Sequence, residues 1–225
     1  MRRLAVLVAV ATTAAVAAGS AAATNECRGL QVCVPVAGPW VVASPGRVEF
    51  QLSCPKRFIV AGLDAELSVR GIELGFVGSL GSPVNPGITT SRDAVFLGRL
   101  VRGGNAASSF RPHIGCVPAS GGGRRTPTAY RPFPPGKATT RLALTVQVRP
   151  GTVTRTARCG ARERLVTATY ALGFFGDAPP PVSVVRAVHV RRSVRSGAVR
   201  LSVQAGPAVA GARAVVQLDL MCAPR

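Results

Sequence analysis

Residues 44–54 read SPGRVEFQLSC, and residues 149–159 read RPGTVTRTARC. The two stretches lie 105 positions apart, and each runs from a Pro-Gly pair to a cysteine over the same number of residues. Pro-Gly pairs mark turns, and in the first stretch Val48, Phe50 and Leu52 alternate with polar residues, as in a strand with one buried face. A pattern that recurs at a fixed distance indicates a repeated structural unit, so we expect two related units in the chain.

The spacing of the cysteines extends this repeat. Cys54 and Cys116 are 62 positions apart, Cys159 and Cys222 are 63 apart, and the second cysteine of each pair begins a Cys-x-Pro sequence. An even number of cysteines is typical of disulfide-bonded exported proteins. We therefore predict three disulfides, one closing each unit and one in the entry segment: Cys54–Cys116, Cys159–Cys222 and Cys27–Cys33.

Alternating side chains indicate strands through most of the chain. RLALTVQV at 141–148 and AVRLSVQA at 198–205 have apolar residues at every second position, and turns containing Gly or Pro separate such segments. No segment has a convincing amphipathic helical pattern. We predict an all-β fold of two tandem, β-sandwich-like antiparallel units, each stapled by a disulfide. Arg155 stands at the position that matches Phe50, so the second unit's first strand is either more exposed or changes its buried face there.

The N-terminus and one polar stretch predict the domain organisation. Residues 1–23 have two arginines, an apolar run and small residues ending in Ala23, which is typical of a secretory signal peptide; a membrane anchor is the alternative. We place a first β unit at 24–116, a linker rich in Gly, Pro and Arg at 117–138, and a second β unit at 139–225. We expect no transmembrane segment in the mature chain.

The chain is strongly basic, with a net charge of +19, or +17 without Arg2 and Arg3. The positive field of such a protein attracts polyanions, which outside a cell include anionic wall polymers and polysaccharides. Few aromatic residues are available to stack on bases, so we expect no sequence-specific nucleic-acid binding. The candidate anion-binding residues lie in the predicted linker and at 186–200: Arg124, Arg125, Arg186, Arg191, Arg192, Arg195 and Arg200. Alternatively, the arginine excess reflects a genome rich in GC codons and has no role in binding.

The chain offers few residues for catalysis or metal binding. Asp64 and Glu66 are two apart on a predicted strand and share a face, a spacing that glycoside hydrolysis would permit. His113 and His189 alternate with apolar neighbours, and we expect both on solvent-exposed strand faces. No histidine or cysteine pattern matches a metal site, so we predict no metal. We also predict no catalytic residues and no cofactor. The loop at 78–91 is long enough to bind a ligand, but it has no counterpart in the second unit.

The segment CPKRFIVAGLDAEL at 54–67, together with IGCVP at 114–118, resembles units of uncharacterised exported proteins of actinobacteria and their relatives. Those units open with Cys-Pro and close on a strand that ends in cysteine, whereas the second unit here opens with Cys159-Gly160. The resemblance implies an exported protein but no activity and no site residues.

We therefore predict a secreted or envelope-associated, non-enzymatic protein whose basic surface binds anionic extracellular polymers. Its oligomeric state does not follow from the sequence. A secreted hydrolase acting on polysaccharide and a structural protein without a specific ligand are the alternative functions.

Overall fold

The protein is built from antiparallel β-sheets, as the sequence predicts. The computed structural model describes residues 24–30, 32–78, 91–119 and 139–225. The predicted signal peptide, nearly all of the 78–91 loop and most of the predicted linker, with Arg124 and Arg125, lie outside the described residues. The strands of the described part are β1 (Val34–Ala37), β2 (Trp40–Val42), β3 (Val48–Ser53), β4 (Phe58–Leu67), β5 (Ile72–Gly78), β6 (Asp93–Leu100), β7 (Ser109–Pro118), β8 (Thr140–Val148), β9 (Gly151–Arg158), β10 (Glu163–Phe175), β11 (Val188–Arg195), β12 (Ala198–Ala205) and β13 (Arg213–Pro224).

The strands form one long sheet and two short ones. The long sheet has the order β1-β7-β2-β10-β13-β8, and β4 pairs with β7 as well. The short sheets are β3-β6-β5 and β11-β12-β9. The two halves of the chain have the same strand order. The first half contains β2-β7-β4 and β3-β6-β5, and the second half contains β8-β13-β10 and β9-β12-β11 in the matching positions.

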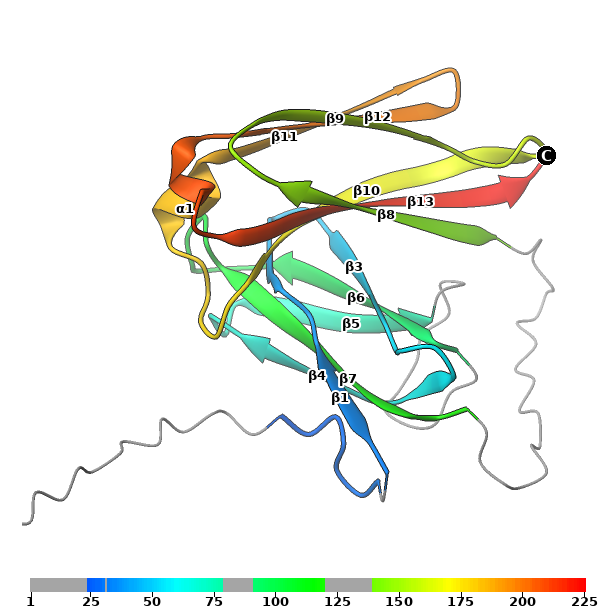
Figure 1. Cartoon of the computed structure of the whole chain (residues 1–225), viewed down its shortest axis with the longest axis vertical. Helices are drawn as coiled ribbons and strands as arrows, with labels where there is room; N and C mark the ends of the chain where they lie inside the picture. Colours follow the sequence, from blue (N-terminus) through cyan, green and yellow to red (C-terminus); the bar gives the residue numbers. More distant parts are fainter. Residues whose placement is uncertain (1–23, 31, 79–90, 120–138) are drawn as a thin grey trace, which may run out of the picture.

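The strands lie in four layers (Figure 1), from β9, β11 and β12 at one end to β1, β4 and β7 at the other. The long sheet supplies two of these layers, and each short sheet supplies one. Two apolar cores lie between the layers. The first contains Phe96, Phe110 and Ile114, and the second contains Leu201 and Leu218; all five side chains are fully buried. Each half therefore has a sandwich core of its own, which is where the hydrophobic stabilisation of the fold arises.

Strand β2 joins the two halves into one sheet. On one side Val41 pairs with Phe110 of β7, and on the other side it pairs with Gly173 of β10. A side chain on Gly173 would place its Cβ 2.6 Å from the ring of Pro39, so glycine permits the close approach of the two segments. The halves are therefore connected by strand pairing in addition to the chain itself.

Buried polar contacts hold β3 of the first half against β13 and β8 of the second. The side chain of Gln217 accepts a hydrogen bond from the Gln51 amide (2.6 Å) and donates one to the Gln51 carbonyl (3.0 Å). Arg141 Nη1 donates to Glu49 Oε2 at 2.7 Å and to Asp219 Oδ2 at 2.6 Å. All three charged side chains are at most 9% exposed, so solvent screens these ion pairs little.

Burial and charge act in opposite directions on this group. Burial raises the pKa of Asp219, while the charge of Arg141 and its hydrogen bond act to lower it, and the net direction is upward. Burial alone would lower the pKa of Arg141, but the hydrogen bonds and charges of Glu49 and Asp219 outweigh it and raise that pKa. Arg141 is therefore charged at any ordinary pH.

Three disulfides join Cys27 to Cys33, Cys54 to Cys116 and Cys159 to Cys222, the pairs that the cysteine spacing predicts. The two long-range bridges each connect the residue after a short-sheet strand, β3 or β9, to a long-sheet strand, β7 or β13. They therefore tie the two layers of each sandwich together, and each is expected to contribute roughly 4 kcal/mol through the loop it closes.

The structure settles two points that the sequence left open. Arg155 is exposed while Val153 and Ala157 pack on the core, so β9 is a more exposed edge strand and its buried face does not change. A single helical turn, α1 (Val182–Arg186), follows the Pro179–Pro181 run within a segment where the sequence gives no helical pattern. With five residues, α1 is too short to show a periodic pattern in the sequence.

Candidate functional site: a basic sheet face

The outer face of the β11-β12-β9 sheet brings together four arginines from three strands. Ala198 of β12 lies between Arg195 of β11 and Arg158 of β9 in the strand register. Arg200 and Ser202 follow on the same face of β12, and Arg191 is the β11 partner of Ser202. Because cross-strand partners point to the same side of a sheet, all four arginines share one face, which we call the basic face.

The opposite side of this sheet explains why the basic face is exposed. Val199, Leu201 and Val203 alternate with the outward residues of β12, and each is at most 1% exposed against the core. Period-two alternation then directs the remaining side chains into solvent. The other outward positions are polar or small, namely Thr152, Thr154, Thr156, His189, Ser193, Ala198, Ser202 and Gln204.

No carboxylate compensates the charge of this face. The strands β9, β11 and β12 contain no aspartate or glutamate. Within the described ranges, none of the four arginines takes part in an ion pair. Arg191 and Arg195, four residues apart on β11, stand about 13 Å apart, and Arg195 and Arg158, on either side of Ala198, stand about 10 Å apart, so their guanidinium groups can bind several anionic groups of one ligand.

The structure divides the arginines that the sequence singled out. Arg191, Arg195 and Arg200 belong to the basic face. Arg192 is on the other side of β11, and Arg186 is exposed on α1. His189 is exposed on the basic face, in agreement with the sequence prediction.

Arg158 was not among the residues predicted from the sequence. It joins the basic face only because β9 pairs with β12 in the register that sets Arg158 opposite Ala198. The separation of 40 positions between these partners leaves no local signal in the sequence.

The prediction of a solvent-exposed His113 is wrong. His113 is 6% exposed, and its Nε2 lies 2.8 Å from Glu66 Oε1, although the two groups are not aligned for a hydrogen bond. On the other side, His113 Nδ1 lies 3.7 Å from the buried carboxylate of Glu26. The residue is buried because the N-terminal segment, residues 24–30 with Cys33, covers this part of β4 and β7.

Backbone contacts seat this N-terminal segment. A Cβ on Gly62 would lie 1.6 Å from the Glu26 carbonyl oxygen, and the amide of Asn25 donates a hydrogen bond to Asp64 Oδ2 at 2.6 Å. The structure thus brings the three candidate hydrolase residues together, Asp64 and His113 being register partners. All three residues contact other parts of the protein, and Glu66 also pairs with Arg111 at 3.7 Å. His113 is buried and therefore inaccessible to a substrate while the N-terminal segment is in place.

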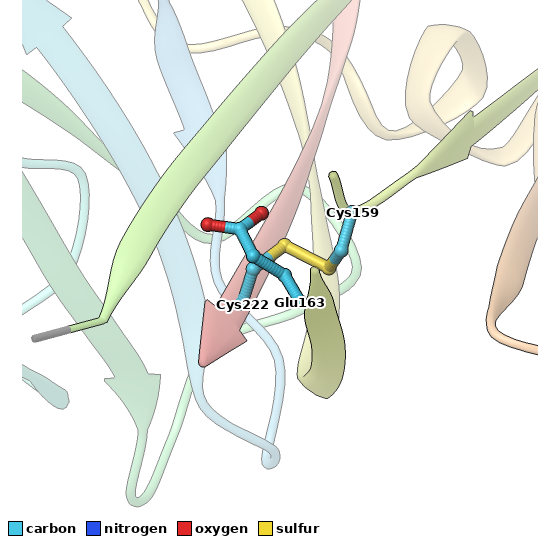
Figure 2. A group of neighbouring side chains, drawn as sticks. All are labelled: Cys159, Glu163 and Cys222. Carbon is cyan, nitrogen blue, oxygen red and sulfur yellow. A yellow bond between two sulfur atoms is a disulfide. The ribbon is translucent and has the colours of Figure 1, made fainter. Parts of the chain in front are cut away.

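Cys159, Glu163 and Cys222 form a compact group at one end of the second sandwich (Figure 2). Their ligand atoms lie within 4.8 Å of one another, but both sulfurs belong to a disulfide and cannot bind a metal as thiolates. Glu163 instead accepts hydrogen bonds from the Thr140 hydroxyl at 2.7 Å and the Gly160 amide at 2.9 Å, and these lower its pKa. The group is therefore structural, and it links the start of β8 to the start of β10.

The chain matches no known protein-family model, no curated protein and no solved structure. Within the described residues, no helix has the length and apolar character needed to cross a bilayer.

Proposed function

We propose that the protein is an exported, non-enzymatic binding protein whose basic face engages anionic polymers of the cell wall or the extracellular matrix. The single observation that carries this proposal is the set of four exposed arginines on one sheet face without an acidic residue among its strands. Uncompensated charge of one sign on a surface raises the local concentration of oppositely charged ligands.

The shape of the basic face favours an extended ligand. A sheet face offers repeated sites at regular spacing, and a linear polymer with regularly spaced carboxylates or phosphates can contact several arginines at once. Each contact is weak at an exposed site, so the affinity comes from their number and from the release of counterions. The proposal therefore implies binding that weakens steeply as salt is added.

Export is part of the proposal. It is supported by the signal-peptide pattern of residues 1–23 and is compatible with three disulfides, which persist in oxidising compartments. Membership in the actinobacterial group of exported Cys-Pro proteins, on the resemblance at 54–67, is likewise a proposal.

The test compares two variants that remove the same charge from different surfaces. The face variant carries Arg191→Gln, Arg195→Gln and Arg200→Gln. The control variant carries Arg28→Gln, Arg70→Gln and Arg102→Gln, three exposed arginines of the first half. Binding to polygalacturonate and to polyphosphate is measured over a range of salt concentrations.

We expect the face variant to bind more weakly and to lose about two to three units of the slope of log affinity against log salt. The control variant should keep both its affinity and its slope. Equal losses in the two variants would mean that net charge alone, and not the basic face, sets the binding. That result, or wild-type binding that does not respond to salt, would overturn the proposal.

A further inference from the structure

A groove of about 420 Å³ lies at the junction of the two halves. It is bounded by β10, by β11 and by the connection between β2 and β3, and its lining includes Val42, Arg47, Leu172, Val190, Arg192 and Tyr170. The groove therefore has apolar walls, one aromatic ring and two cationic side chains. A concave site with mostly apolar walls and a few converging polar groups is the usual form of a ligand-binding site.

Tyr170 supplies the aromatic surface of the groove. Its side chain is 38% exposed, although its register partner Leu218 is fully buried in the core. The Tyr170 hydroxyl has no hydrogen bond with any described residue. A partly exposed tyrosine offers an apolar ring face together with a free polar end, which suits a ligand that is itself apolar on one side and hydroxylated at its rim.

The charges at the groove are those that an anionic ligand requires. Within the described part of the chain, Arg192 has no ion-pair partner, and Arg47 is 58% exposed. One acidic group is close, since Arg47 Nε lies 3.1 Å from Glu49 Oε1. That carboxylate is nearly buried and is already bound by Arg141, so it leaves the outer side of Arg47 available.

The groove is continuous with the basic face around one strand. β11 is the edge strand of its sheet, and consecutive residues of a strand point to opposite sides. Arg191 therefore lies on the basic face, while its neighbour Arg192 lines the groove. A chain-like ligand that leaves the basic face over β11 can reach both Arg192 and Tyr170, which line the groove.

We propose that this groove is a saccharide subsite and that the polymer bound by the protein is an acidic polysaccharide. A sugar ring packs its C–H face on Tyr170, and a carboxylate or phosphate on that sugar or its neighbour pairs with Arg192 and Arg47. This inference rests on the proposed function and narrows it, because a polyanion without sugar rings would use the basic face but gain nothing from Tyr170.

The experiment uses Tyr170→Ala, the ring-preserving Tyr170→Phe, and Phe175→Ala as a matched control. Phe175 is on the same strand, is 39% exposed and does not line the groove, so its removal deletes a similar aromatic surface elsewhere. The probes are a galacturonate oligosaccharide and a polyphosphate of similar charge. In a Tyr130→Phe background, Tyr170 is the one remaining tyrosine, so its ring proton resonances report sugar contact directly.

We expect Tyr170→Ala to bind the galacturonate oligosaccharide about three- to tenfold more weakly, with polyphosphate binding unchanged. Tyr170→Phe keeps the ring and should lose less affinity for the oligosaccharide than Tyr170→Ala does. Phe175→Ala should bind both probes as the wild type does, and the Tyr170 ring resonances should shift with the oligosaccharide alone.

If Tyr170→Ala binds the oligosaccharide as the wild type does, the saccharide subsite is overturned while the basic face stands. The same holds if Tyr170→Ala and Phe175→Ala lose affinity for both probes equally. If the wild type binds neither probe in a salt-dependent way, the proposed function fails and this inference fails with it.

Discussion

Replacing Arg141 with methionine tests the buried ion-pair group that holds the two halves together. The substitution keeps a long side chain but removes the cation that pairs with both Glu49 and Asp219. The side chains of these acids are 9% and 2% exposed, so water cannot replace the lost partner. Glu49 keeps its pair with Arg47 at 3.1 Å, whereas Asp219 keeps no ion pair with any described residue. A buried carboxylate without a partner destabilises the folded state strongly, and it does so most when it must be ionised.

The size of the effect follows from protonation. A carboxyl group avoids the cost of a buried charge by taking up a proton, which at pH 7 costs about 1.4 kcal/mol for each unit between its ordinary pKa and the solution pH. For Asp219, with an ordinary pKa of 3.8, this sets an upper limit of about 4 kcal/mol, because the pKa is already raised in the wild type; losses of about 3–5 kcal/mol are usual for broken buried pairs. The loss in stability should shrink to about 2 kcal/mol at pH 5, because protonating the carboxylate then requires less free energy.

The sign of the pH dependence is definite. A carboxyl whose pKa is raised in the folded state contributes stability below its ordinary pKa and loses it as the pH rises through the folded value. Arg141→Met raises the pKa of Asp219 further, so the variant should become less stable between about pH 4 and pH 7 relative to the wild type.

The assay is urea unfolding followed by circular dichroism at pH 5 and pH 7, with Arg99→Met as the control. Arg99 also pairs with a glutamate at 2.8 Å, but both side chains are more than half exposed, so its loss should cost less than about 1 kcal/mol at either pH. An Arg141→Met variant within 1 kcal/mol of the wild type at pH 7, or one with the same loss at both pH values, would refute this reasoning.

Two further substitutions test other parts of the fold. Gly62→Ala should unseat the N-terminal segment, because its Cβ would lie 1.6 Å from the Glu26 carbonyl oxygen; mild reduction and alkylation should then label Cys27 several-fold faster. The control Gly46→Ala, whose closest neighbour would be at 3.7 Å, should label like the wild type, and equal rates in both variants would contradict the seating described here. Glu163→Gln removes a carboxylate with a lowered pKa, which stabilises the folded state above pH 4.5 and stops doing so as the pH falls. The melting temperature of the variant should therefore depend less on pH in acid than that of the wild type. The same acid dependence in thermal scans of both proteins would contradict this assignment.

Sequence reasoning succeeded where the signal is a spacing along the chain. The strand positions follow from alternation within each segment, and the disulfides follow from the matched distances of Cys54 to Cys116 and Cys159 to Cys222. It failed at His113, where alternation correctly assigns a strand face opposite to Ile114 but carries no information about what covers that face. The covering residue, Glu26, is 87 positions away.

The same limit separates Arg141 from Arg191. Both arginines occupy the polar face of an alternating strand, and nothing in the local pattern distinguishes them. One is buried because β3 of the first half packs on β8 and β13, and the other is exposed because no described element covers the outer face of its sheet. Periodicity along a strand thus determined which side chains point the same way. The packing of sheets and the register of distant strands alone decided whether each face meets protein or solvent, because a one-residue slip or a different neighbour reverses that outcome without changing the local sequence.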